Sequence, residues 1–371
     1  MSVPEQMPCH DEVPACRADS VEQSFKVEKK RYEWIDNARI IAAWLIVCFH
    51  MAFLFPGLNN AIGHGLVAET TYCGRVPFFL ILAGYFLARN ITWSKAFDRA
   101  LWLFVPFALW NFLLYAWWHH PFLFDWHQAF LDIPQMLGVG SIFNIEFSIF
   151  GLEPTPPTIP ITWFLRDIIV LSLLTPIIAK ARKYLLIVVV LAGLLYFNFE
   201  PDDRPKVLLW PPTCIWYILG VSLSSFKIRD AYLIMNKSFT PYVLAGLFAA
   251  TCYVFLAAKL HLPSIPVTIF GGIFGALMIA HFGVLIEKHF PKLSKRLSPC
   301  GPACFLVFVL HYPLLETLKC FIPNSLCASP WIIIASVPIC IVIIAFFLLL
   351  KRYTPWIMPY LCHMKVPKQK S

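Results

Sequence analysis

Charged side chains are scarce in this chain of 371 residues. Only 14% of its residues are Asp, Glu, Lys or Arg, whereas 59% are hydrophobic and 16% are aromatic. A typical soluble domain has about 25% charged and about 45–50% apolar residues. The composition therefore argues against an ordinary soluble domain and indicates a chain that uses lipid as its solvent.

The sequence also lacks the cysteine and histidine spacings of a metal site. Its 12 cysteines form no CxxC pair, and no His/Cys group has the spacing of metal ligands. We expect no metal and no permanently bound cofactor, and we expect most cysteines to be small core residues. Cys320 and Cys327 flank a predicted external loop, where a disulfide and two free thiols both stay open, with free thiols favoured.

Long apolar runs take the place of the missing charges. A membrane helix needs about 20 mainly apolar residues, and the qualifying stretches are 34–56, 71–88, 100–118, 161–179, 184–199, 207–226, 240–258, 266–286, 303–322 and 331–350. The sequence therefore predicts an all-α polytopic membrane protein with about ten transmembrane helices. We expect a disordered cytosolic tail over 1–31, a transmembrane domain over 32–352 and a cytosolic C-terminal tail over 353–371.

Lys and Arg are absent from the longest segment between predicted spans, His119–Pro160. With the N-terminal tail in the cytosol, most Lys and Arg outside the spans fall on the cytosolic side. The exceptions are Arg204, Lys206, Lys259 and Lys319. This asymmetry follows the positive-inside rule. It predicts a multi-pass protein of the cytoplasmic (inner) membrane with both termini cytosolic, and it argues against nucleic acid as the partner of the basic residues.

Three ionisable residues interrupt the first predicted span. Asp36 and Arg39 are three residues apart and therefore neighbours on a helix. His50 follows 11 residues after Arg39, which puts it within about 20° of the same azimuth and about 16 Å further along the axis. Such a polar face must turn toward protein or a wet cavity. An interfacial ion pair with a satisfied core histidine is the alternative, but the alignment of three groups favours a functional face.

Four motifs occur in order along the chain: KRYEWIDNARIIAAWLIVCFH, GRVPFFLILAGYFLARN, WFLRDIIVLSLLTPII and FLVFVLHYPLLE. Together they resemble the integral-membrane acyltransferase family 3, whose members modify cell-envelope glycans, and the resemblance covers about residues 31–350. In that family an Arg, ten intervening residues and a His mark the first helix, and Arg39 and His50 fit this spacing. Asp36 fits the Asp before the Arg, whereas Ala83 stands where the family usually has Ser.

The resemblance implies transfer of an acyl group, often acetyl, from cytosolic acyl-CoA to a sugar hydroxyl on the far side of the membrane. His50 would act as general base, because a neutral imidazole can accept a hydroxyl proton, with Arg39 and Asp36 in the same catalytic site. Family members often carry two arginines three apart in the second cytosolic loop. In this chain Lys95 and Arg99 are four apart, and we expect them to bind the donor.

Further polar residues are expected to contact the acceptor or support the site: His311, Trp163, Arg166 and Arg75. A core role and a functional role for His311 are equally favoured, function is slightly favoured for the Arg166–Asp167 pair, and snorkelling to the interface is favoured for Arg75.

Two rival functions fit the same composition. A transporter or flippase of a lipid-linked or polymeric glycan would also need many spans, but such proteins often show inverted repeats and broken helices, which we do not find in the sequence. A non-catalytic scaffold leaves the polar face of the first span unexplained. The expected partners are acyl-CoA, an envelope glycan and the lipid bilayer, and the oligomeric state stays open.

Overall fold

The computed structural model describes residues 32–54, 74–89, 91–119, 133, 163–181, 184–185, 187, 211–236, 246, 265–321 and 334–362. The chain divides into two compact units, Met1–Tyr32 and Glu33–Ser371, and the helices of the structure all belong to the second unit. Within the described ranges every regular element is a helix, so the all-α prediction is confirmed there.

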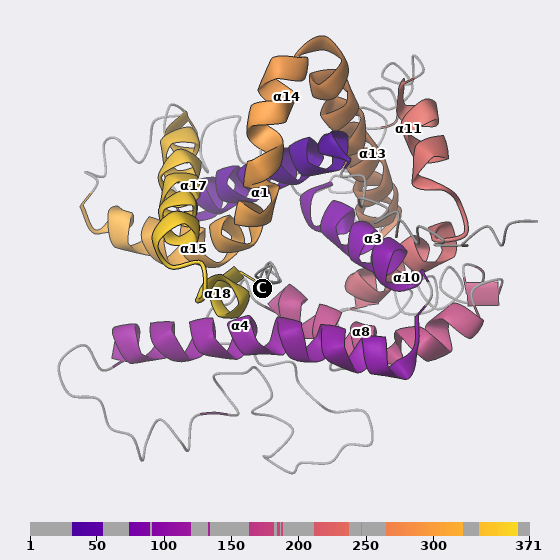
Figure 1. Cartoon of the computed structure of the whole chain (residues 1–371), viewed down its shortest axis with the longest axis horizontal. Helices are drawn as coiled ribbons and strands as arrows, with labels where there is room; N and C mark the ends of the chain where they lie inside the picture. Colours follow the sequence, from indigo (N-terminus) through magenta and orange to yellow (C-terminus); the bar gives the residue numbers. More distant parts are fainter. Residues whose placement is uncertain are drawn as a thin grey trace, which may run out of the picture. The chain divides into compact units, whose positions relative to one another are not determined.

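The helices follow one another along the chain and are labelled in Figure 1. They are α1 (Glu33–Leu54), α3 (Arg75–Leu87), α4 (Trp93–His119), α8 (Trp163–Lys180), α10 (Pro211–Leu223), α11 (Ile228–Asn236), α13 (Ile265–His289), α14 (Pro291–Leu297), the 3₁₀ helix η5 (Ser298–Ala303), α15 (Cys304–Lys319), α17 (Ser336–Tyr353) and α18 (Met358–Cys362).

In the described part of the chain, 5 helical stretches are long and apolar enough to cross a membrane: Glu33–Met51, Trp93–Ala116, Gly271–His289, Pro291–Lys319 and Ser336–Tyr353. Two shorter apolar helices, Arg75–Leu87 and Thr213–Leu223, lie at further predicted spans. The spans predicted at 184–199 and 240–258 fall almost entirely outside the described residues, as do the tail 1–31, nearly all of His119–Pro160 and Cys327. The total of about ten spans therefore stays a prediction.

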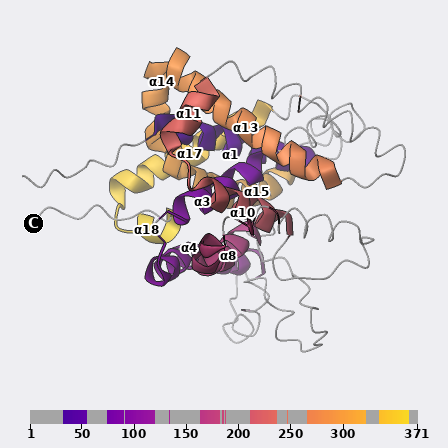
Figure 2. The same cartoon turned by 90° about the vertical axis from the view of Figure 1, so that its right-hand side faces the viewer.

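Helix α1 packs against many of the other helices, with α13, α15, η5 and α3 among its neighbours. Its most buried apolar residues include Ala38, Ala42 and Val47, each 0% exposed. Small side chains of this kind let helix backbones approach closely. Figure 2 shows α13 running beside α1, in agreement with the contacts between them.

The sequence GGIFG in α13 provides a second close approach between helices. A Cβ added at Gly74, which precedes α3, would overlap the backbone of Gly275. The packing role expected for these small residues is confirmed, because no larger residue at position 74 fits without moving one backbone from the other.

The outward face of α17 is apolar and exposed, with Ile341, Val342 and Leu349 each more than half exposed. Isolated exposed apolar side chains are normal in soluble proteins, whereas a large contiguous apolar surface marks an interaction surface. An apolar face on a helix of this length and hydropathy suits contact with lipid chains.

Two helix boundaries differ from the predicted ones. Helix α4 begins at Trp93 rather than near residue 100, so Lys95 and Arg99 lie on its first turns and not in a loop. The physical reason is a cap, since the hydroxyl of Thr92 accepts a bond from the backbone N–H of Lys95 at 3.3 Å. Beyond residue 353, the short helix α18 packs on α4, and the indole of Trp110 donates to the carbonyl of Leu361 at 3.0 Å.

Candidate active site

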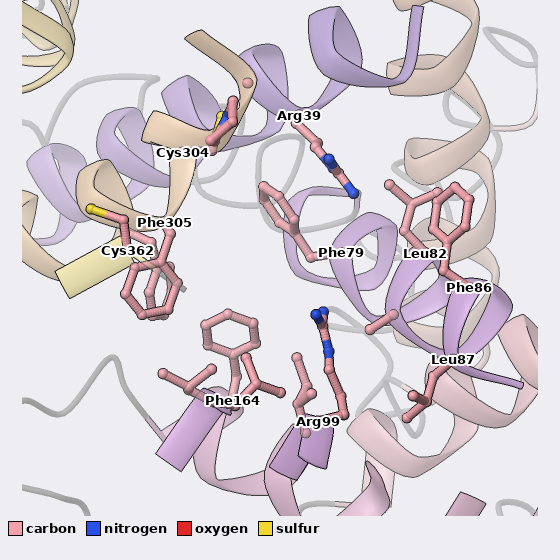
Figure 3. A pocket seen from close by; sticks show the side chains of 17 residues that line it. Arg39, Phe79, Leu82, Phe86, Leu87, Arg99, Phe164, Cys304, Phe305 and Cys362 are labelled. Carbon is pink, nitrogen blue, oxygen red and sulfur yellow. The ribbon is translucent and has the colours of Figure 1, made fainter. Parts of the chain in front are cut away.

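A cavity of about 580 Å³ opens among α1, α3, α4, α8, η5, α15 and α18. Its described lining is mostly apolar and holds two cations, Arg39 from α1 and Arg99 from α4, and no carboxylate. Figure 3 shows the two guanidinium groups reaching into the cavity from opposite sides, each toward the other. A cavity with two facing cations and apolar walls suits an elongated ligand that carries both an anionic and an apolar part.

A buried carboxylate holds Arg39 at the cavity wall. Asp36 is 4% exposed and lies 3.4 Å from the Arg39 guanidinium, on the preceding turn of α1. Its other oxygen accepts a bond of 3.0 Å from the hydroxyl of Ser298 in η5. Gly301 packs so closely on the carboxylate that an added Cβ would overlap it. The charge of Asp36 is thus compensated on two sides, and the guanidinium of Arg39 is left about one-third exposed toward the cavity.

A second polar contact clamps the start of α1 to α14. The side-chain amide of Asn37 donates to the hydroxyl of Ser294 at 2.8 Å, and that hydroxyl donates to a carboxylate oxygen of Glu33 at 2.8 Å. These three residues and Ser298 were not anticipated from the sequence, because Ser294 and Ser298 are more than 250 positions away from their partners. Only Glu33 and Asn37, placed beside Asp36 on the first turns of α1, offered a sequence-level hint.

His50 lies near the other end of α1, where the structure brings it together with His311 of α15. Nδ1 of His50 is 3.1 Å from Nε2 of His311, and the two ring centroids are 4.9 Å apart. Each Nδ1 also meets a backbone carbonyl one turn earlier in its own helix: 3.0 Å to Ile46 for His50 and 2.8 Å to Val307 for His311. The sequence expectation that these histidines share a site agrees with this geometry, whereas their catalytic role stays a prediction.

Aromatic rings fix the surroundings of His50. The ring of Tyr312 stands at 89° to the imidazole with centroids 5.7 Å apart, and the adjacent Phe49 packs on it edge-on at 5.1 Å. The guanidinium of Arg75 stacks 3.5 Å from the centre of the Phe49 ring. Arg75 is only 3% exposed. The snorkelling favoured for Arg75 is therefore wrong, because the side chain turns inward and packs on an aromatic ring instead of reaching the interface.

Two phenylalanines link the cavity to the histidine pair. Phe164 of α8 and Phe308 of α15 both line the cavity, and their rings meet at 70° with centroids 4.1 Å apart. The Phe308 ring is also 6.2 Å from the ring of His311, whereas neither histidine is part of the described cavity lining. The wall between the cavity and the histidines at this point is therefore aromatic.

The structure distributes the remaining predicted site residues differently. Arg99 lines the cavity, whereas Lys95 is exposed and outside the described lining. Arg166 and Asp167 form a buried ion pair at 3.2 Å on α8, beside the lining residues Phe164 and Leu165 but not among them. Trp163 is the first residue of α8, and its side chain is outside the described part.

Ala83, where the resembling family usually has Ser, is part of the cavity lining. The chain therefore presents a methyl group at a place where a hydroxyl would face the ligand. Among the described residues, no three or more His, Cys, Asp or Glu side chains gather as metal ligands would. The expectation of no metal concerns the whole chain and stays a prediction.

The comparisons with known proteins point in one direction. No curated protein and no solved structure matches the chain. A family model described as an acyltransferase domain matches residues 32–349, from the first residue before α1 to the last turns of α17. The protein, with its apolar helices and its basic cavity, therefore belongs to this family of membrane acyltransferases.

Proposed function

We propose that the protein is an O-acyltransferase that moves an acyl group, acetyl by preference, from acyl-CoA to a hydroxyl of a cell-envelope polysaccharide or glycolipid. The observation that carries the proposal is the placement of a histidine pair behind an aromatic wall of a cavity with two facing arginines, in a chain of an acyltransferase family.

The cavity provides for the two chemically different parts of the donor. Arg39 and Arg99 bind donor phosphates, for which the planar guanidinium is well suited because it can donate two parallel bonds. The aromatic and aliphatic walls accommodate the less polar arm that carries the thioester. Lys95, one turn before Arg99 on α4 and exposed, attracts the phosphates toward the cavity and makes a smaller contribution to binding.

The reaction proceeds with His50 as general base. The imidazole takes the proton of the acceptor hydroxyl while the hydroxyl oxygen attacks the thioester carbonyl carbon. The carbon–sulfur bond then breaks, and the departing CoA thiolate takes the proton from the His50 imidazolium, which leaves a free thiol, an ester and a neutral His50. Since Phe164 and Phe308 stand between the cavity and the histidine pair, the acyl end of the donor passes these rings to reach His50.

The protein resides in the cytoplasmic membrane with both termini in the cytosol. The distribution of Lys and Arg along the sequence supports this orientation. It places the Asp36–Arg39 end of α1 toward the cytosol, where acyl-CoA is available, and the His50 end toward the external side, where the glycan acceptor is presented.

A transporter or flippase would use the same cavity without breaking a thioester. We would measure free-thiol release from acyl-CoA by the purified full-length protein in lipid nanodiscs, together with mass spectrometry of envelope glycans from deletion and complemented strains. Acceptor-dependent thiol release and loss of O-acyl groups on deletion are expected. Loss of a whole glycan from the cell surface, with no thiol release by the protein, would replace the proposal by the transport function.

A further inference from the structure

Three short contacts around the two imidazoles determine where their protons lie. A backbone carbonyl can only accept a hydrogen bond, so the contact of 2.8 Å between Nδ1 of His311 and the Val307 carbonyl requires a proton on that nitrogen. In the neutral ring of His311, Nε2 then has no proton and offers a lone pair. This lone pair lies 3.1 Å from Nδ1 of His50.

Nδ1 of His50 therefore has two acceptors in front of it. One is Nε2 of His311, and the other is the carbonyl oxygen of Ile46 at 3.0 Å. A proton on Nδ1 satisfies both contacts, whereas the opposite tautomer would set its lone pair against the lone pairs of the carbonyl. The Ile46 carbonyl lies where the α-helix already uses it for the N–H of residue 50. His311 is thus the acceptor with a lone pair still to offer.

We infer that His311 is a positioning residue, which accepts a hydrogen bond from Nδ1 of His50 and thereby leaves Nε2 of His50 as the nitrogen that acts as the base. The order of donation runs from His50 to His311 to the Val307 carbonyl. Its catalytic meaning rests on the proposed function, but the order of the hydrogen bonds itself does not.

The arrangement has two consequences for the proton transfer. In the described part of the chain, Nε2 of His50 makes no hydrogen bond, so it is available to the acceptor hydroxyl. When Nε2 takes the proton, the ring becomes a cation and its Nδ1–H still donates to His311. Hydrogen bonds from charged donors are roughly twice as strong as neutral ones, so the contact strengthens as the reaction proceeds.

His311 thus does for His50 what an orienting acceptor does in any nucleophile–base–orienter constellation. It differs from a carboxylate in being neutral, which suits a site among apolar and aromatic side chains, where an unpaired buried charge is costly. The Tyr312 ring at 89° to the imidazole restricts rotation of the His50 ring and helps to keep Nδ1 directed at His311.

The hydrogen bond can be observed without any assay. The full-length protein, labelled with ¹⁵N-histidine and reconstituted in lipid bilayers, is suited to solid-state NMR, with His50→Gln and His311→Gln used to identify the two rings. We expect a protonated Nδ1 and an unprotonated Nε2 in His50, and a ¹⁵N–¹⁵N coupling across the bond to Nε2 of His311. An unprotonated Nδ1 in His50 would overturn the inference even if the protein is an active transferase.

Variants of His311 then separate acceptance of the bond from simple packing. His311→Gln keeps a side-chain oxygen that can accept from Nδ1 of His50, whereas His311→Phe keeps a ring without an acceptor. We expect His311→Phe to lower kcat by about 10–100-fold, a part of the about 10²–10⁴-fold that a general base contributes, with KM for the donor unchanged. We expect His311→Gln to recover most of that loss.

His281→Phe is the matched control. His281 is also a buried histidine, 4% exposed, whose Nδ1 contacts a backbone carbonyl, that of Met235 at 2.7 Å, but it lies on α13 outside the site. It should change the melting temperature and leave kcat nearly unchanged. Equal kcat values for the Gln and Phe variants of His311 would overturn the inference, whereas absence of thiol release by the wild type would overturn the proposed function and leave the NMR result valid.

Discussion

The two ends of α1 place polar groups in an apolar protein by different means. At one end, Asp36 and Arg39 are both charged and compensate each other, with Ser298 as a further donor to the carboxylate. At the other end, His50 and His311 form a chain of hydrogen bonds that ends on a backbone carbonyl and needs no full charge. Charge is held where a cavity receives an anion, and neutral imidazoles are held where a proton has to move.

The difference matters because a buried charge and a buried base have opposite requirements. A buried ion is tolerated only when paired and hydrogen-bonded. A general base has to be neutral and accessible before the reaction. Along one helix, about 16 Å of rise between residues 39 and 50 keeps the two environments apart. A donor with phosphates at one end and a thioester at the other is suited to span them.

Replacement of His50 breaks the neutral end and should have the largest effect. An amide can hydrogen-bond but cannot take a proton, so His50→Gln should lower kcat by about 10²–10⁴-fold, the usual contribution of a general base. Acyl transfer and the melting temperature should be measured on the same preparation. A satisfied core histidine would instead give near-normal turnover with a changed melting temperature, and that result would remove His50 from the catalytic role.

The sequence was sufficient to predict the contents of α1 but not what faces them. The azimuth of Asp36, Arg39 and His50 follows from helix geometry alone, since 11 residues are close to three turns. The partners Ser298 and His311 lie more than 250 positions later, and their approach depends on how η5 and α15 pack on α1. The resemblance placed His311 in a motif, but only packing shows which nitrogen of it meets His50.

Arg75 shows the opposite case, where a local rule gave the wrong side-chain direction. An arginine at the end of an apolar helix commonly extends to the interface. In this protein it is buried on the Phe49 ring, and the preference is reversed by the packing of α3. Similarly, the start of α4 at Trp93 depends on the Thr92 cap, which the hydropathy of the following residues did not indicate.

The charged end should respond in binding rather than in turnover. Arg99→Ala removes a charge-assisted contact to donor phosphate, worth about 1.5–3 kcal/mol, so KM for acyl-CoA should rise by about 10–100-fold with little change in kcat. Arg99→Lys should fall in between, because Lys offers a point charge without the bidentate fork. The measurement is initial-rate kinetics with donor and acceptor varied in turn.

Lys95→Ala is the matched variant for this test. It removes a cation from the same helix, one turn earlier, at an exposed position outside the described cavity lining. Its effect on the donor KM should be clearly smaller than that of Arg99→Ala. An equal effect of both variants would show that long-range attraction, rather than contact within the cavity, brings the donor to the site.

The smallest effect on turnover is expected where the charged end is supported rather than where it meets the ligand. Ser298→Ala removes the donor of the 3.0 Å bond to Asp36 and adds no bulk. Because a hydrogen bond to a charged group contributes about 1.5–3 kcal/mol, the free energy of unfolding should fall by that order. Arg39 still pairs with Asp36, so the donor KM should rise only slightly and kcat should stay nearly constant.

The exposed Ser225, whose hydroxyl donates to the carbonyl of Ser222 at 3.1 Å, gives the matched control, and Ser225→Ala should be nearly neutral in both measurements. Thermal unfolding in nanodiscs, followed together with donor kinetics, distinguishes the two ends of α1. A large loss of kcat without a loss of stability in Ser298→Ala would mean that Asp36 takes part in the chemistry itself. The separation of a charged binding end from a neutral catalytic end would then have to be abandoned.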